Sequence, residues 1–201
     1  MDIKRIDSYV DARFPQQALW QHGAFEADGE AVWFEIVSED KAVVHGKCCP
    51  QLIEEFRFFA EHITVFYDEN GAMLAQFPRV ETFPVEISDI QPSQFYVDEE
   101  KLEAVRHFVR TERDIVVPLT QMDGRYVSLD GHTRMAAALE MGIETVQGFF
   151  TQADECLYDF AREAMRRGIR TPGDMEKLSH EEYCEKWHKY CDDFFAARKD
   201  G

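Results

Sequence analysis

The sequence lacks any apolar run near the roughly 20 residues that a membrane-spanning helix needs, and it opens on Met-Asp-Ile-Lys-Arg rather than on the apolar core of a signal peptide. Its five cysteines are odd in number, irregularly spaced and without a Cys-x-x-Cys pair, which excludes a regular disulfide framework. We therefore expect a cytoplasmic protein with reduced thiols and no membrane partner.

Positive charge is also scarce: 22 Lys and Arg face 39 Asp and Glu, for a net charge of −17. Residues 1–80 hold 7 basic and 14 acidic residues, residues 81–150 hold 6 and 13, and residues 151–201 hold 9 and 12. No part of the chain is therefore a basic module. Because non-specific binding to nucleic acid relies on cationic side chains that displace counterions from phosphates, nucleic acid is a disfavoured partner.

What the sequence does contain is enough apolar residues, 45% of 201, to bury a core. Its first 82 residues predict strands at 31–37 and 41–45, a helix from Pro50, and a hairpin of strands 63–67 and 72–77. Asn70-Gly71 between those strands is typical of a type I′ turn. Ile3, Ile6 and Val10 are spaced as one face of a short helix that ends at Phe14-Pro15.

The prolines between residues 78 and 92 predict an extended connection and a boundary. A helix capped by Asp98 runs to about residue 110, strands cover 115–120, 125–129 and 144–150, and a helix covers 133–141 up to Gly142. Two amphipathic helices follow, the second with a capping box at Ser179. The prediction is an α+β (α/β) fold with an N-terminal α+β region (1–82), a central domain (83–150) and a C-terminal helical extension (151–201).

The most informative stretch is residues 125–138, where a strand runs through a tight turn directly into a helix. Asp130 can cap that helix, and Gly131 lets the backbone pass close to a ligand. The first helical N–H groups then point outward, Thr133 adds a hydroxyl and Arg134 a two-pronged donor. This pattern predicts a phosphate or carboxylate site. The alternative is a capped helix whose arginine pairs with a surface carboxylate.

The motif resembles a known family. Ile87-Ser88-Asp89-Ile90-Gln91-Pro92, then Val117-Pro118-Leu119, then the run from Tyr126 to Arg134 with its Asp-Gly-His-Thr-Arg core, are similar to the ParB/sulfiredoxin superfamily, whose members mostly carry it as a ParB-like nuclease domain. The similarity covers residues 84–150, about a third of the chain. It implies a compact α/β domain that binds a nucleotide through its phosphates at this motif, often with a divalent metal.

Within that superfamily the motif is most similar to the free-serine-kinase branch. This resemblance implies a phosphotransferase or phosphohydrolase acting on a small molecule with ATP or another nucleotide and Mg²⁺, and no metal held by the protein alone. Asp130 and His132 would be catalytic, and Gly131, His132, Thr133 and Arg134 would bind the phosphates. The chain departs from the kinases because Pro92-Ser93-Gln94-Phe95 lacks their early glutamate.

Other branches fit the motif less closely. The reactive cysteine of sulfiredoxins falls at His132, and the arginine-rich box and helix-turn-helix of the partitioning clamps are missing. The missing glutamate favours a second hypothesis, a non-catalytic regulatory or interaction module. A third hypothesis, a ParB-like nuclease or DNA-binding protein, conflicts with the charge.

Three further clusters have structural and functional interpretations. Cys48-Cys49-Pro50 at a helix start is either a reactive thiol or a buried junction. His180, Cys184, His188 and Cys191 lie on one predicted helix, but eleven residues span about 16 Å, too far for one zinc ion, so an ordinary amphipathic helix is favoured. Arg162, Arg166, Arg167 and Arg170 are interleaved with Asp159 and Glu163 and predict an internally paired, solvated face.

Overall fold

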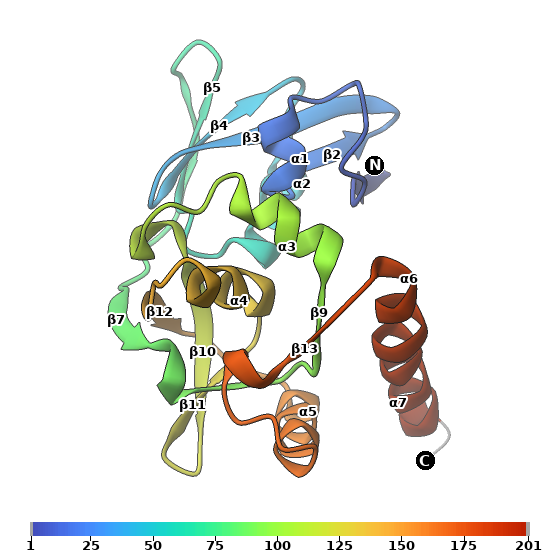
Figure 1. Cartoon of the computed structure of the whole chain (residues 1–201). Helices are drawn as coiled ribbons and strands as arrows, with labels where there is room; N and C mark the ends of the chain where they lie inside the picture. Colours follow the sequence, from blue (N-terminus) through green and yellow to red (C-terminus); the bar gives the residue numbers. More distant parts are fainter. Residues whose placement is uncertain (1, 200–201) are drawn as a thin grey trace. The chain divides into compact units, whose positions relative to one another are not determined.

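A computed structural model describes residues 2–199 (Figure 1). The fold is α+β, as the patterning predicts, and the chain divides into two compact units, Met1–Thr82 and Phe83–Gly201. No helix among the described residues is long and apolar enough to cross a membrane.

The first unit is built on one sheet whose strand order follows the sequence. Its strands are β1 (Ile3–Arg5), β2 (Ala24–Ala27), β3 (Glu30–Ser38), β4 (Lys41–His45), β5 (Val65–Asp68) and β6 (Met73–Gln76). Neighbours are antiparallel except for β4 and β5. Those two are parallel because α2 (Pro50–Phe59) connects them as a crossover. A short helix, α1 (Gln16–Trp20), precedes β2.

Aromatic rings fill the core between α2 and this sheet. Phe34 and Phe56 stack with their centroids 4.0 Å apart, and Phe25 and Phe66 meet this pair edge-on. The buried residues Leu52, Ile53 and Phe56 repeat at helical spacing, so one face of α2 lies on the sheet.

Two local predictions in this unit are wrong. The predicted helix through Ile3 and Val10 does not form. Ile3 belongs to β1, which pairs with β2, and Val10 is exposed. The 70–71 turn is not type I′, since of its two central residues only Gly71 has a positive φ (81°). The Asp68 carboxylate instead organises a longer loop by accepting from the Asn70 and Ala72 N–H groups at 2.9 and 2.8 Å.

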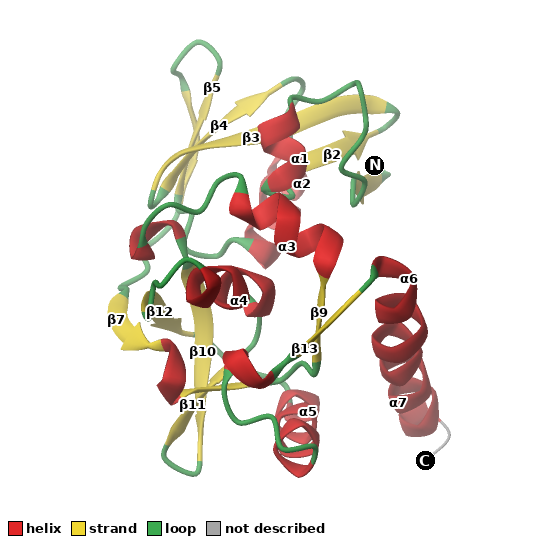
Figure 2. Cartoon of the chain, in the orientation of Figure 1, coloured by secondary structure: helices red, strands yellow, loops and turns green. Residues whose placement is uncertain are grey.

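The second unit contains a five-stranded mixed sheet of order β7-β12-β10-β11-β8. These strands are β7 (Phe83–Glu86), β8 (Ile90–Pro92), β10 (Val116–Met122), β11 (Arg125–Ser128) and β12 (Thr145–Phe150). A separate parallel pair consists of β9 (Tyr96–Asp98) and β13 (Glu176–Leu178). The helices are α3 (Glu99–Arg106), α4 (His132–Glu140), α5 (Glu155–Arg166), α6 (His180–Tyr183) and α7 (Lys189–Lys199), with a π-helical turn at Cys184–His188 between the last two (Figure 2).

One apolar cluster ties the central residues to the C-terminal helices. Phe95 lies edge-on to Trp187 and Tyr190, with centroids 5.0 and 4.8 Å away, and Phe160 of α5 packs on the same rings. Ala136, Ala137 and Ala138 of α4 are buried in the same cluster. Residues 151–199 therefore share a core with residues 83–150.

Candidate functional site

The predicted motif lies at one edge of the five-stranded sheet. Strands β8 and β11 are parallel, with Ser128 opposite Pro92, so the residues that follow both strands emerge side by side. Strand β10 runs antiparallel to β11, which brings its first residues to the same edge. The start of α4 therefore lies between Ser93 and the Val116–Pro118 segment.

Gly131 starts the helix, and here the structure corrects the sequence prediction. Asp130 is not the N-cap: Gly131 holds that position, with φ 84° and ψ 9°. This left-handed conformation is unfavourable for residues with a Cβ. A Cβ at Gly131 would also lie 3.2 Å from a Val117 methyl group. Glycine is thus required here both by the backbone and by the approach of β10.

The beginning of α4 offers backbone donors. The Met135 N–H is the first to bond within the helix, donating to the Gly131 carbonyl at 2.9 Å. The preceding N–H groups of residues 132–134 have no helical carbonyl one turn earlier, and they lie at the positive end of the helix dipole. An anion placed against this turn would be stabilised by both.

Arg134 and Asp130 form an ion pair across the first turn. Arg134 Nη2 donates to Asp130 Oδ2 at 3.1 Å, and Nη1 donates to the Val116 carbonyl at 3.1 Å. The Arg134 side chain is 21% exposed and that of Asp130 58%. The guanidinium is thus anchored on β10 by one nitrogen, while the other is held by an exposed carboxylate that an anionic ligand could displace.

His132 is buried beneath this turn. The Ser93 N–H donates to its Nε2 at 3.1 Å, and Ser128 Oγ lies 3.1 Å from the same atom. Because a backbone N–H can only donate, Nε2 accepts and the ring proton resides on Nδ1. Burial lowers the pKa of His132 to about 4, so the ring is neutral at pH 7.

This environment gives His132 a positioning role. Its ring joins the end of β8 to the start of α4, and Ser93 Oγ adds a bond to the Ser128 carbonyl at 2.8 Å. Sequence reasoning missed Ser93 and Ser128 as its partners. Ser128, at the end of β11, lies four residues before His132, but Ser93 is 39 residues away and no local pattern could indicate it. The predicted contact between His132 and phosphate stays a prediction, and it would have to be made through Nδ1.

Thr133 lies on the first turn and is half-buried. Within residues 2–199, no group of three or more His, Cys, Asp and Glu side chains could hold a metal ion. A Mg²⁺ ion brought by a nucleotide needs fewer protein ligands, because it is commonly bound through one or two carboxylates together with phosphate oxygens. The exposed carboxylate of Asp130 fits that requirement.

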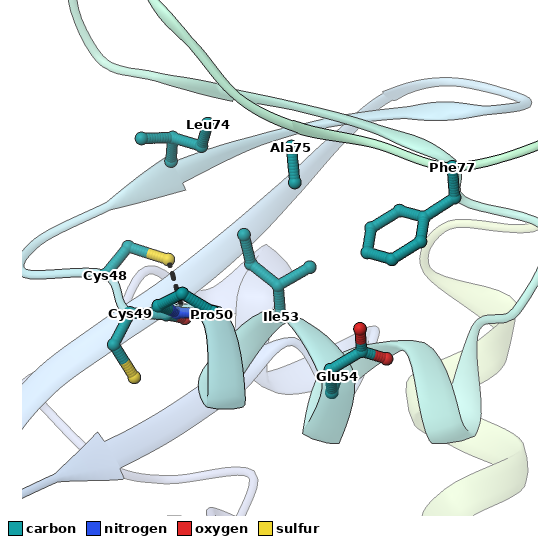
Figure 3. Close-up of a pocket in the computed structure, with 8 residues that line it drawn as sticks. All are labelled: Cys48, Cys49, Pro50, Ile53, Glu54, Leu74, Ala75 and Phe77. Atoms are coloured by element: carbon teal, nitrogen blue, oxygen red, sulfur yellow. Dashed lines mark hydrogen bonds between the residues drawn. The ribbon is translucent and has the colours of Figure 1, made fainter.

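The Cys48–Cys49 pair lines an apolar cavity of about 130 Å³ in the first unit (Figure 3). Ile53, Leu74, Ala75 and Phe77 form its walls, and the two cysteine side chains point in different directions. Burial raises the pKa of Cys48 to about 11, which opposes thiolate formation at neutral pH. The structural interpretation of this pair is therefore favoured over an activated thiol at a helix start.

The arginine-rich helix α5 is internally paired. Arg162 contacts Asp159, and Arg166 and Arg167 both contact Glu163. The guanidinium of Arg167 also stacks over the Phe95 ring, 4.3 Å from its centroid. These arginines thus serve packing and pairing within the second unit.

Comparisons with known proteins add little to this geometry. No protein-family model matches the chain, and no curated protein matches it. Among solved structures the chain is similar to protein Atu1540 from Agrobacterium tumefaciens, with 16% identity and a TM-score of 0.35. The match covers 50% of this chain and 64% of the Atu1540 chain, less than two thirds of its length. A similarity of this size carries no argument about function.

Proposed function

We propose that the protein is a cytoplasmic, nucleotide-binding protein of the ParB/sulfiredoxin type, and that the start of α4 binds the nucleotide's phosphates. We further propose that it transfers a phosphoryl group to a small molecule or hydrolyses a phosphate bond. The observation that carries this proposal is that the left-handed Gly131 starts α4 beside the Arg134 guanidinium, so that the first-turn N–H groups have no helical acceptor.

Each residue of the motif has a role in this proposal. The phosphate displaces Asp130 from Arg134, whose second nitrogen stays fixed on the Val116 carbonyl. The backbone N–H groups of the first turn and the Thr133 hydroxyl complete the phosphate contacts. The buried His132 keeps the turn in register with Ser93.

The displaced Asp130 carboxylate provides the chemical function. It orients a hydroxyl group or a water molecule and accepts its proton while that oxygen attacks phosphorus in line with the leaving phosphate. A Mg²⁺ ion bound by Asp130 and phosphate oxygens would neutralise the negative charge that develops on the transferring group.

Nucleotide binding is tested by thermal unfolding with ATP, ADP, CTP, GTP or pyrophosphate, with and without Mg²⁺. A ligand present at a hundred times its Kd stabilises the folded state by about 2.7 kcal/mol, a shift of about 5–10 °C for a chain of this size. We expect Arg134→Ala to abolish that shift. Arg125→Ala is the matched control, because this guanidinium also bonds backbone carbonyls, those of Ser88 and Arg170, but lies at the start of β11, away from residues 130–134.

A non-catalytic regulatory or interaction module is the second candidate function. It is favoured by the contacts that Arg134 already makes and by the buried, neutral state of His132. Binding without turnover of any nucleotide would support this module, whereas no shift with any nucleotide would contradict the phosphate site itself. DNA binding in low salt that disappears with added salt would instead revive the nuclease or DNA-binding hypothesis.

A further inference from the structure

Three side chains outside the α4 site form a linked series of hydrogen bonds. Asp98 Oδ2 lies 2.8 Å from His180 Nδ1, and His180 Nε2 lies 3.6 Å from Cys184 Sγ. The series therefore joins a carboxylate, an imidazole and a thiol in the order in which a base-activated nucleophile is built.

The topology of the small parallel sheet brings these residues together. Strands β9 and β13 run side by side, with Leu178 opposite Asp98, and each leads directly into a helix (Figure 1). Asp98 caps α3 at the end of β9, and His180 is the first residue of α6 after β13. Cys184 follows one turn later, at the start of the π-helical turn Cys184–His188. Such turns frequently occur at functional sites.

Asp98 fixes the imidazole in one tautomer. Its side chain is completely buried, and Oδ1 accepts from the Glu100 N–H at 2.9 Å while Oδ2 contacts His180. A carboxylate can only accept, so Nδ1 of His180 carries a proton, and in the neutral form of the ring Nε2 presents its lone pair to the thiol. The Cys184 S–H therefore donates to His180.

Cys184 is accessible, and its surroundings differ from those of two other cysteines. The side chain of His180 is 50% exposed and Cys184 is only partly buried, so a small reagent can reach the thiol. Cys48 and Cys191 are also partly buried, but desolvation raises the pKa of each to about 11. Cys184 Sγ, by contrast, lies within hydrogen-bond distance of an imidazole nitrogen.

We propose that Cys184 is a nucleophilic cysteine, with His180 as its base and Asp98 as the positioning residue, and that its substrate is a small hydroperoxide. His180 Nε2 takes the thiol proton while the sulfur attacks one peroxide oxygen. The S–O bond forms, the O–O bond breaks, and the leaving hydroxide takes the proton from His180 to become water. The sulfur is oxidised to a sulfenic acid and hydrogen peroxide is reduced to water.

A hydroperoxide suits this site better than an acyl substrate. Acyl transfer also needs hydrogen-bond donors aimed at a developing oxyanion. Peroxide reduction needs only a reactive thiol and a proton for the leaving group, and the pair of Cys184 and His180 supplies both. This inference does not depend on nucleotide binding at α4.

The test exposes the full-length protein to hydrogen peroxide, traps sulfenic acid with dimedone, and measures labelling at each cysteine by peptide mass spectrometry. We expect Cys184 to label faster than Cys156 of the same molecules by at least about tenfold, at the low end of what a positioned base contributes. This comparison needs no variant, so it does not depend on whether a substituted chain folds. Labelling of Cys184 no faster than Cys156 would overturn the proposal.

Variants then assign the roles. His180→Gln should reduce labelling at Cys184 to the level of Cys156, whereas His188→Gln should leave it unchanged, since His188 is the histidine four residues on the other side of Cys184. Asp98→Asn keeps an oxygen for the Glu100 N–H but favours the other tautomer of His180, so it should also slow labelling and change its pH profile. An unchanged rate in His180→Gln would overturn the assignment of the base.

The experiment must also distinguish a free Cys184 thiol from one that binds a metal ion together with His180. Labelling is therefore repeated after dialysis against a chelator. We expect the same rate, whereas labelling of Cys184 that appears only after metal removal would show a thiol held by an ion and would contradict a free nucleophile.

Discussion

The backbone N–H of Ser93 donates to Nε2 of the buried His132 at 3.1 Å, and this bond joins the end of β8 to the first turn of α4. It holds the proposed phosphate-binding turn in place without occupying the turn's own N–H groups. His132 thereby acts from beneath the site, while Arg134 and Asp130 lie at its surface.

The burial of His132 predicts a pH-dependent stability. The unfolded chain protonates this ring near pH 6.5 and the folded chain only near pH 4, so acidification through this window favours the unfolded state. The free energy of unfolding should therefore fall by up to about 3 kcal/mol as the pH drops from 6.5 to 4, because the neutral ring is favoured only in the folded state. Urea unfolding between pH 7 and 5, before most carboxylates titrate, measures this loss. His132→Gln should lack it, and equal slopes for the two proteins would contradict the prediction.

Gly131→Ala should destabilise the second unit more than Gly142→Ala does. Both Gly131 and Gly142 have positive φ values, 84° and 75°, but a Cβ at Gly142 meets nothing within 4 Å whereas one at Gly131 meets Val117. A side chain in this conformation costs about 1–2 kcal/mol, so Gly142→Ala gives the backbone cost alone. Urea unfolding of the two variants should show a larger loss of unfolding free energy for Gly131→Ala than for Gly142→Ala. Equal losses would show that the Val117 side chain moves aside at no cost.

Asp130→Asn should separate binding from turnover. The substitution removes the negative charge beside Arg134, so pyrophosphate no longer competes with a carboxylate for the guanidinium. We expect a larger thermal shift with pyrophosphate in the absence of Mg²⁺, together with loss of any nucleotide turnover. A smaller shift would mean that Asp130 holds Arg134 in its binding position rather than competing for it.

Cys48 should react slowly with iodoacetamide at pH 7.5. A rise of the pKa from its ordinary value of 9.0 to about 11 lowers the thiolate fraction by about two orders of magnitude. Peptide mass spectrometry of the folded protein should therefore show little alkylation at Cys48, and unfolding in urea should restore it. Rapid alkylation in the folded state would revive the interpretation of Cys48 as an activated thiol.

The sequence by itself determined the α+β class and most elements of the fold, because those elements follow from signals between neighbouring residues. The capping box at Ser179, the Asp98 cap, the proline that starts α2 and the apolar stripe of α5 all act within one or two turns. At Ile3, longer-range pairing overrode the local pattern, because its partner strand takes it from the predicted helix.

The tertiary structure alone decided the chemistry of the key side chains. Burial keeps His132 neutral, the Ser93 N–H determines its tautomer, and Asp98, 82 residues from His180 in the sequence, contacts Nδ1 of that ring. Both contacts arise because parallel strands, β8 with β11 and β9 with β13, end at a common edge and bring distant residues together. A local sequence pattern cannot predict these contacts, because the contacts depend on which strands pair and in which register.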